Sequence, residues 1–290
     1  MASKFLAACI QLNSKRDIEL NFSEIFQLLD KAIGKGADFI TFPECTGMME
    51  PDHDLLKEKA PFEQDHKLLV AIREKAIKGK VWILIGSLAI RLFDNRIVNR
   101  SYLIDEKGNI AATYDKIHMF DVKLDANQVY RESEAYKPGS RAVLVNLPWG
   151  RLGLTICYDI RFAYLYRTLA QNGADFITIP AAFTKISGEA HWHILQRARA
   201  IETGCYIISA AQCGTHAEGR ETYGHSLIVD PWGKIMADGG KGIGLILAEI
   251  DPDKVNQART KIPSLSHDRN FDLSQQMMGE NKGNRADTGH

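Results

Sequence analysis

The segment GADFITFPE at residues 36–44 returns almost letter for letter as GADFITIPA at residues 173–181. In each copy a glycine leads into a short apolar run with β-branched residues, and a proline follows it, which is the pattern of a buried β-strand. At the last position, however, Glu44 in the first copy corresponds to Ala181 in the second. The repeat therefore predicts one structural element that is used twice, and a carboxylate that the strand itself does not need.

Strand-like and helix-like patterns alternate around both copies, which is typical of an α/β fold. Helical spacing of apolar residues predicts helices over 21–36, 64–78, 163–172 and 189–203. In the last of these, Ile194, Ala198 and Ile201 share one stripe, and Gly204 ends the helix. Apolar runs predict strands over 5–12, 37–43, 81–90, 97–105, 109–116, 142–148, 151–159, 174–180, 205–212, 225–230 and 244–251. Because the strands are apolar on both faces, we expect two sheets stacked face to face, with helices outside each.

The domain organisation is simple. The pattern contains no sharp linker, so we expect one domain over residues 1–265. A long irregular stretch over about 117–140 separates the two halves, and loops of this length are usually functional or disordered. Residues 266–290 are polar, and we expect a tail that is mobile or wrapped on a partner subunit.

The charge balance excludes some classes of partner. Lys plus Arg and Asp plus Glu both number 36, so the zero net charge gives no electrostatic reason to expect nucleic acid or an anionic membrane as partner. No apolar run reaches the roughly 18 to 20 residues that span a bilayer. The short apolar N-terminal stretch fits a first strand better than a signal peptide. The five cysteines form no Cys-x-x-Cys pair, which favours a reduced, cytoplasmic protein.

Cys157 is a candidate nucleophile because the apolar run LGLTICYDIRF (152–162) turns there into a helical pattern. A thiol at such a turn can project from the carboxyl end of a sheet, where the N–H groups of a helix N-terminus would lower its pKa. The alternative is a small buried hydrophobic residue, which is the commoner role of an intracellular cysteine. The cysteines inside strand patterns fit that structural role: Cys9, Cys205 and Cys213. Cys45 is ambiguous, since it follows Glu44 directly.

The histidines provide no evident base or metal site. His191 and His193 are two residues apart on a predicted helix, so they face different ways. Three others near predicted strand ends stay open as bases, although no pattern pairs one with a cysteine: His118, His216 and His225. The sequence has no HExxH motif and no Cys/His cluster. We therefore expect neither a metal nor a cofactor.

Three predicted strands end in a polar, reactive residue, namely Glu44, Lys116 and Cys157. Ligand sites of α/β sheets gather at the carboxyl ends of the strands, so we expect these side chains to meet. A carboxylate base, an ammonium group and a thiol would together form an acyl-transfer site that needs no histidine. On this interpretation Ala181 marks what the repeated strand needs for folding, and Glu44 is the residue added for chemistry.

These residues also carry a family resemblance. The motifs FPE (42–44), YDKIH (114–118) and CYDIRF (157–162), in this order, resemble the Glu–Lys–Cys motifs of the nitrilase superfamily of carbon–nitrogen hydrolases. The resemblance covers about residues 5–260. It implies a four-layer α-β-β-α sandwich with two stacked mixed sheets, and a homodimer or a higher homo-oligomer. It also implies that Glu132 is a second active-site glutamate, a choice that the residues alone do not make over Glu134.

Further segments narrow the resemblance within the superfamily. AHWHILQRARAIE (190–202), AAQCGTHAEGRETYGHS (210–226) and VDPWG (229–233) resemble the branch that contains deaminated glutathione amidase. The neighbouring ω-amidase branch, acting on substrates of the 2-oxoglutaramate type, shares the first segment. We therefore expect an amidase that hydrolyses a small carboxylate-bearing amide through a cysteine thioester, with release of ammonia.

The residue types define the expected roles. Glu44 would take the proton of the Cys157 thiol, whose sulfur would attack the amide carbonyl. Lys116 and the backbone N–H of Tyr158 would stabilise the oxyanion, and Glu132 would position the hydrolytic water. Guanidinium groups bind carboxylates in a bidentate manner, and three arginines are candidates for that contact, although each fits a structural ion pair equally well: Arg161, Arg197 and Arg199.

Other functions stay open. A catalytically idle scaffold or sensor of the same fold would tolerate loss of the three reactive residues, yet all are present. A histidine-dependent cysteine hydrolase is disfavoured by the placement of FPE and YDKIH. Hydrolysis of a nitrile, or transfer of the acyl group to an amine, would use the same thioester.

Overall fold

The two copies of the repeat form equivalent strands. The computed structural model describes residues 3–124 and 128–274. In it the first copy contains strand β2 (Phe39–Thr41) and the second contains β10 (Phe176–Thr178). Each lies inside its own six-stranded sheet. The prediction of one element used twice is confirmed.

The aspartate of each copy makes the same contact with the preceding strand. The backbone N–H of Leu6 donates to Asp38 at 2.7 Å, and that of Arg151 donates to Asp175 at 2.9 Å. The glycine that leads into each copy has a positive φ, which a residue with a Cβ adopts only with strain. The recurring glycine and aspartate are therefore the residues that join each strand to its neighbour.

The two sheets share one topology. The first sheet has the order β16-β1-β2-β3-β4-β5 and the second the order β15-β14-β11-β10-β9-β8. Each repeated strand runs parallel to both of its neighbours, and the outer strands are antiparallel. The first sheet is formed by β1 (Phe5–Gln11), β2, β3 (Trp82–Arg91), β4 (Ile97–Ile104), β5 (Ile110–Asp115) and β16 (Gly244–Ile250). The second is formed by β8 (Val143–Leu147), β9 (Gly150–Leu154), β10, β11 (Tyr206–Ser209), β14 (Leu227–Val229) and β15 (Ile235–Asp238).

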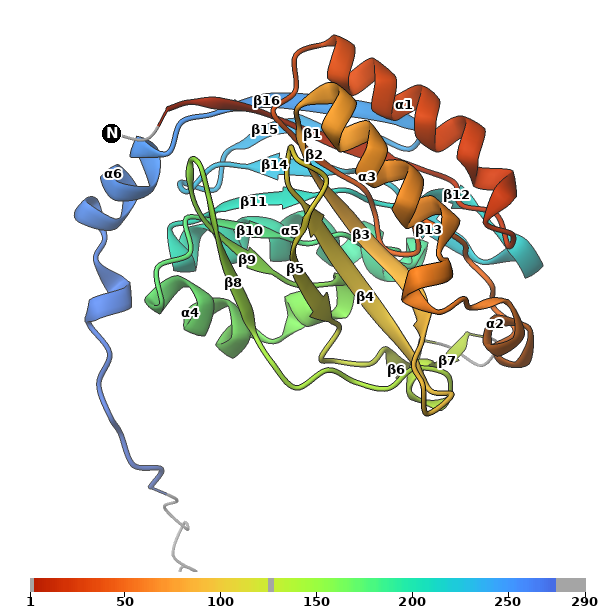
Figure 1. Cartoon of the computed structure of the whole chain (residues 1–290). Helices are drawn as coiled ribbons and strands as arrows, with labels where there is room; N and C mark the ends of the chain where they lie inside the picture. The colour runs from red at the N-terminus through yellow and green to blue at the C-terminus, as the bar shows by residue number, and fades with distance from the viewer. Residues whose placement is uncertain (1–2, 125–127, 275–290) are drawn as a thin grey trace, which may run out of the picture.

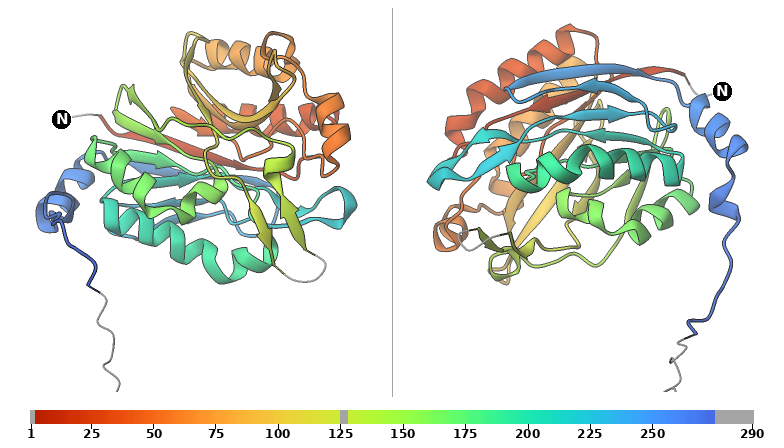
Figure 2. Two further views of the ribbon diagram at one scale, coloured as in Figure 1. Left: turned by 90° about the horizontal axis from the view of Figure 1, so that it is seen from below. Right: turned by 180° about the vertical axis from the view of Figure 1, so that it is seen from behind.

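Helices cover the outer face of each sheet (Figures 1 and 2). Helices α1 (Phe22–Gly34) and α3 (Lys67–Gly79) pack on the first sheet through buried residues such as Ile25 and Ile72. Helices α4 (Ala163–Gln171) and α5 (Lys185–Thr203) lie on the second sheet. The predicted α-β-β-α sandwich is confirmed. Among the described helices, none is long and apolar enough to cross a bilayer.

Several boundaries differ from the predictions. The strand predicted over 151–159 ends at Leu154, and a 3-10 turn, η4 (Cys157–Arg161), comes before α4. The segment 117–140 contains the hairpin β6 (Asp121–Lys123) and β7 (Val129–Arg131), followed by the turn η3 (Glu132–Glu134). Five further α-helices and strands among the described residues were not predicted: α2 (His53–Lys59), β12 (Cys213–Thr215), β13 (Glu221–Tyr223), β15 and α6 (Asp253–Lys261).

The apolar stripe of helix α5 would be expected to face the sheet, but it faces the solvent. Ile194 and Ile201 are 69% and 53% exposed, whereas Trp192, Gln196 and Arg199 are buried against the second sheet. Gln196 accepts a hydrogen bond from the Ser209 hydroxyl at 2.7 Å. Arg199 also finds a partner there, the Ile160 carbonyl, whereas Gln196 Nε2 is buried without a partner among the described residues. The polar face of α5 is thus buried and the apolar stripe is left on the surface.

The predicted tail over 266–290 lies largely outside the described residues. Within its first part, Asp268 pairs with Arg167 and accepts a hydrogen bond from Gln171, both on α4. The single domain over 1–265 stays a prediction.

Candidate active site

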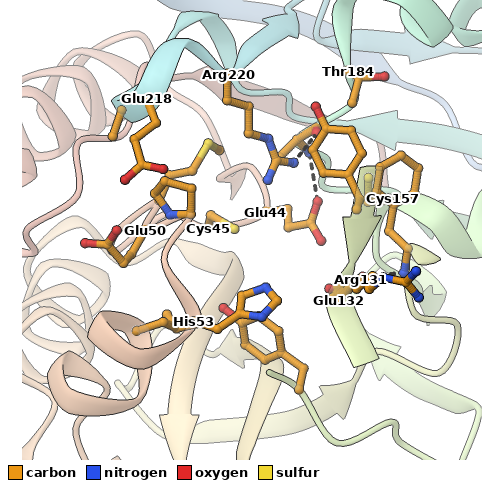
Figure 3. Close-up of a pocket in the computed structure, with 18 of the residues that line it drawn as sticks. Glu44, Cys45, Glu50, His53, Arg131, Glu132, Cys157, Thr184, Glu218 and Arg220 are labelled. Carbon is orange, nitrogen blue, oxygen red and sulfur yellow. Dashed lines mark hydrogen bonds between the residues drawn. The ribbon is translucent and has the colours of Figure 1, made fainter. Parts of the chain in front are cut away.

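The structure brings the three strand-end residues together. Glu44 follows β2, Lys116 follows β5 directly, and Cys157 begins the turn after β9. All three are buried, and they line one cavity of about 790 Å³ together with Glu132. Figure 3 shows Glu44, Glu132 and Cys157 facing this cavity. It lies where the ends of both sheets meet.

Lys116 is the centre of the charged cluster. Its Nζ lies 2.8 Å from Glu44 Oε1, and 2.9 and 2.8 Å from the two carboxylate oxygens of Glu132. The lysine side chain is only 2% exposed. An ammonium group has three N–H donors, so these contacts use all of them.

Backbone and amide donors hold the two carboxylates. Asn99 Nδ2 donates to Glu44 at 3.0 Å and to Glu132 at 3.2 Å. The Ala182 N–H donates to Glu44 Oε2 at 2.9 Å, and the Phe120 N–H donates to Glu132 Oε2 at 2.6 Å. Ala182 directly follows the second repeat, so the ends of the two repeated strands meet at the Glu44 carboxylate. Every oxygen of the two carboxylates thus has a donor.

The protonation states follow from this geometry. Burial raises the pKa of Glu44, but the charge of Lys116 and its hydrogen bond outweigh that effect and leave the pKa lowered. Burial lowers the pKa of Lys116, yet the charges of Glu132 and Glu44 raise it well above the ordinary value. The resting site thus holds a carboxylate and an ammonium ion.

The pKa of Cys157 differs from the predicted one. Burial and the neighbouring Glu44 charge raise its pKa well above the ordinary value, although Lys116 and the Ala182 N–H act against them. We expected the opposite shift from a helix N-terminus, but Cys157 lies in a 3-10 turn with φ +47°. Its own N–H bonds to the Pro180 carbonyl at 2.9 Å. The resting Cys157 side chain is therefore a thiol, and it would need a base to act as a nucleophile.

Asp159 connects the cysteine turn to the lysine strand. Its carboxylate accepts hydrogen bonds from the Tyr114 hydroxyl at 2.7 Å and from the Ile156 N–H at 2.9 Å. It also lies 2.7 Å from His118 Nδ1 and accepts the His118 N–H at 3.1 Å. Tyr114 and His118 lie on either side of Lys116 in the sequence. One buried carboxylate thus fixes the distance between Lys116 and Cys157.

The predicted arginines are not at the cavity. Arg199 is buried under α5, where its Nε donates to the Ile160 carbonyl at 2.8 Å. The Nε of Arg197 donates to the Gly233 carbonyl at 2.8 Å. Arg161 lies over the rings of Tyr158 and Phe183. Arg197 and Arg199 belong to α5 and Arg161 to the turn η4, and none of the three lines the cavity.

The cavity has an arginine that sequence reasoning missed. Arg220 lies between η5 (Ala217–Gly219) and β13, and it points into the cavity near Glu44 (Figure 3). Its Nη2 donates to the Ala182 carbonyl at 3.2 Å. In the sequence, Arg220 belongs to the segment 210–226 that resembles a family branch. Nothing in that segment distinguishes Arg220 from its neighbours.

Among the other thiols and histidines, His53 lines the cavity, where its Nδ1 lies 3.9 Å from Glu134 (Figure 3). Cys45 lines the cavity, but burial and then the Glu44 charge raise its pKa to about 12, so it stays protonated. His118 pairs with Asp159, and His216 contacts Ser14 and Thr222. The histidines that we left open as bases are absent from the described lining of the cavity: His118, His216 and His225.

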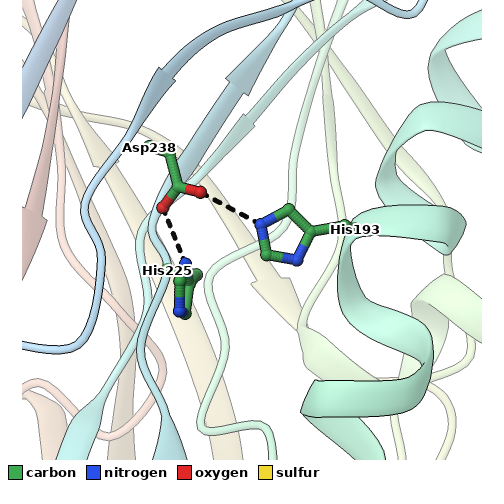
Figure 4. A group of neighbouring side chains, drawn as sticks. All are labelled: His193, His225 and Asp238. Atoms are coloured by element: carbon green, nitrogen blue, oxygen red, sulfur yellow. Dashed lines mark hydrogen bonds and ion pairs between the residues drawn. The ribbon is translucent and has the colours of Figure 1, made fainter.

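His193 has neighbours that the sequence did not predict (Figure 4). Its Nε2 lies 3.0 Å from Asp238, and His225 Nδ1 lies 2.8 Å from the other oxygen of that carboxylate. Ligand atoms of the three residues lie within 4.8 Å of one another, and imidazole and carboxylate groups are of the type that binds Zn²⁺. Each imidazole contacts Asp238, while His225 Nε2 is buried without a hydrogen-bond partner among the described residues, and none of the three side chains lines the cavity.

Comparison with known proteins defines the class. The sequence model of the Carbon-nitrogen hydrolase family matches residues 6–260, and the chain belongs to this family. It is 39% identical over 265 residues to the deaminated glutathione amidase of Yersinia enterocolitica, covering 90% of this chain and 92% of that one. It is also 39% identical to the Homo sapiens deaminated glutathione amidase, covering 91% of this chain and 82% of the relative. The crystal structure of Saccharomyces cerevisiae Nit3, a member of branch 10 of the nitrilase superfamily, matches with a TM-score of 0.81 at 28% identity, covering 91% and 97% of the two chains.

Proposed function

We propose that the protein is an amidase that uses Glu44, Lys116, Cys157 and Glu132, and that its substrates carry a 2-oxoglutaryl group. The observation that carries this proposal is the buried cluster in which Lys116 contacts both glutamates beside the Cys157 thiol. The two amidases similar to this chain support the choice of acyl group.

The first half of the proposed reaction forms a thioester. Glu44 takes the thiol proton while the sulfur of Cys157 bonds to the amide carbonyl carbon. The developing oxyanion takes the place of one Glu132 contact on Lys116 and accepts the Tyr158 N–H; such a donor typically contributes about 2.7–4 kcal/mol. Glu44 then gives its proton to the departing nitrogen, the C–N bond breaks, and the amine leaves.

The second half hydrolyses the thioester. Water gives a proton to Glu44 as its oxygen bonds to the acyl carbon, and the C–S bond breaks. The thiolate recovers its proton from Glu44, so the site returns to its resting state. Glu132 accepts the Phe120 N–H and contacts Lys116, which places it to orient the water.

The leaving group depends on the substrate. Deaminated glutathione carries a 2-oxoglutaryl group on the amine of cysteinylglycine, so its hydrolysis releases that dipeptide. Hydrolysis of 2-oxoglutaramate releases ammonia. The expectation of ammonia release therefore applies only to primary amides, whereas 2-oxoglutarate is the product common to both.

The test compares the two substrates through this common product. We expect the purified protein to release 2-oxoglutarate from deaminated glutathione with a kcat/KM at least about tenfold above that for 2-oxoglutaramate, a difference of about 1.4 kcal/mol. The opposite preference would assign the protein to ω-amidase chemistry. Hydrolysis of a nitrile, acyl transfer to an added amine, or turnover of none of these would contradict the proposal, the last in favour of an idle scaffold.

The pH profile separates the proposed base from a histidine. Glu44 acts as a base only when ionised, and its lowered pKa keeps it ionised above the ordinary glutamate value of about 4.3. We expect kcat/KM to fall as the pH drops below that value, and to stay level up to alkaline pH because the pKa of Lys116 is raised. A steady-state profile measured with 2-oxoglutaramate checks this. An acid limb near pH 6.5 would indicate a histidine base instead.

We also propose a homo-oligomer in a reducing compartment such as the cytoplasm. Ile194 and Ile201 of α5 are exposed, as are Trp232 and Ile262 beside them, and patches of this kind mark protein interfaces. All five cysteines are free thiols, which fits a reducing environment. Light scattering on the purified protein would test the oligomer, and a monomeric mass would contradict it.

A further inference from the structure

Arg220 has the contacts of an anion-binding residue. Its guanidinium carbon lies 5.3 Å from the ring centroid of Tyr130, which covers one face of the group. One hydrogen bond, from Nη2 to the Ala182 carbonyl at 3.2 Å, fixes its direction. The Nε atom is buried and has no hydrogen-bond partner among the described residues. A guanidinium group has five N–H donors, so most of those of Arg220 stay available to a ligand.

The charges around the cavity single out this residue. Three other cationic side chains that line it have carboxylate partners within 4.0 Å: Lys116 with Glu44 and Glu132, Arg131 with Glu134, and Lys185 with Glu221. The acidic residues Glu50 and Glu218, on the same wall as Arg220 in Figure 3, pair with Arg16. No carboxylate of the described chain pairs with Arg220. A guanidinium that is held in place but lacks a counter-ion favours an anion from outside the chain.

Arg220 lies within reach of a chain attached to the reactive carbon. Its partner, the Ala182 carbonyl, belongs to the residue whose N–H donates to Glu44 Oε2 at 2.9 Å. Standard backbone bond lengths then place Nη2 at most about 10 Å from that oxygen. The same N–H acts on the Cys157 thiol. An acyl group of a few carbons can therefore contact both Cys157 and Arg220.

We propose that Arg220 binds the carboxylate of the acyl chain, and so selects amides of dicarboxylic and 2-oxo dicarboxylic acids over neutral amides. This inference rests on the proposed amidase function. The acyl group remains on the enzyme after the amine departs, so a carboxylate bound by Arg220 is held in both halves of the reaction. A carboxylate on the leaving group would be lost after the first half.

The test measures kcat/KM for wild type, Arg220→Gln and Arg220→Lys with three amides. 2-Oxoglutaramate carries its carboxylate on the acyl chain, pentanamide carries none, and N-pentanoylglycine carries one only on the leaving group. The matched control is Arg197→Gln, which removes an arginine that contacts the Gly233 carbonyl away from the cavity. Release of ammonia or glycine reports turnover.

We expect Arg220→Gln to lower kcat/KM for 2-oxoglutaramate about 100-fold, mainly through KM, because a charge-assisted contact is lost. Turnover of the other two amides should change by less than about threefold, and Arg197→Gln should resemble wild type for all three. Arg220→Lys should recover part of the loss, since it restores the charge but not the bidentate geometry.

Two results would overturn the inference. An equal loss on pentanamide would mean that Arg220 acts on Glu44, whose pKa its charge helps to lower, and not on the substrate. A selective loss on N-pentanoylglycine would place the bound carboxylate on the leaving group. Binding of 2-oxoglutarate, measured by calorimetry, is independent of turnover. If wild type hydrolyses none of the amides but binds 2-oxoglutarate and Arg220→Gln does not, the proposed function fails while the anion site stands.

Discussion

Replacement of Cys157 by alanine is expected to lower kcat/KM for 2-oxoglutarate release by at least about 10⁴-fold, because the nucleophile of a covalent mechanism is lost. The change removes only a sulfur atom, and alanine keeps the Cβ, so the fold should persist. No neighbouring group can replace it, since the carboxylates of Glu44 and Glu132 are occupied by Lys116 and by backbone N–H donors. A discontinuous assay of 2-oxoglutarate over hours measures a loss of this size.

The matched control is Cys45→Ala. Cys45 follows Glu44 and lines the same cavity, and it has a positive φ like Cys157, so the two substitutions are comparable in place and backbone conformation. With a pKa raised to about 12, its thiol is not a nucleophile at neutral pH, and the variant should keep activity within about threefold of wild type. Retained turnover in Cys157→Ala, or its loss in Cys45→Ala, would disprove the assignment of the nucleophile.

Lys116→Met is expected to destabilise the protein by about 3–5 kcal/mol and to abolish activity. The variant leaves Glu44 and Glu132 buried without their cation, and an uncompensated buried charge has a cost of this size. Urea unfolding measures the free-energy change.

The pH dependence of this loss has a defined sign. Without Lys116, burial raises the folded-state pKa of Glu44 above its unfolded value, so stability falls as the pH rises through that pKa. Destabilisation by Lys116→Met should thus be larger at pH 8 than at about pH 5. Lys185→Met is the control, because the Lys185–Glu221 pair is roughly half exposed and such pairs contribute about 0–1 kcal/mol. Equal effects of the two substitutions would contradict a buried, charged cluster.

The sequence predicted the parts of the molecule that depend on short segments. Each repeated strand is defined by its own glycine, aspartate and apolar run, so the two sheets followed from them. The meeting of Glu44 and Lys116 was also predictable, because strand ends gather at one edge of a sheet. Cys157 joins them from the second sheet, so its approach depends on how the two sheets stack. The sequence pattern alone did not favour Glu132 over Glu134 as the second glutamate of the site, whereas the family resemblance did. In the structure, Glu132 contacts Lys116.

The failures concern tertiary contacts. On α5 the apolar residue Ile194 is exposed and the charged residue Arg199 is buried, because Arg199 finds a carbonyl partner below the helix. Periodicity alone cannot show that a polar group has such a partner. Arg220 lies in a loop without periodicity, and its position depends on Tyr130, about 90 residues away in the chain. The pKa of Cys157 was predicted in the wrong direction because burial and the neighbouring Glu44 charge raise it, and neither is visible in the local sequence.

The two sheets share one topology, but they contribute different residues to the site. The first half of the chain provides the proposed base, Glu44, and the proposed oxyanion contact, Lys116, and the second half provides the proposed nucleophile, Cys157. Neither half is a smaller version of the proposed enzyme, since the first sheet takes β16 from the end of the chain and either half alone would hold only part of the site. Ala181 occupies the position in the second repeat that Glu44 occupies in the first. Ala181 is fully buried, so a carboxylate placed there would need a cation of its own, as Glu44 has in Lys116.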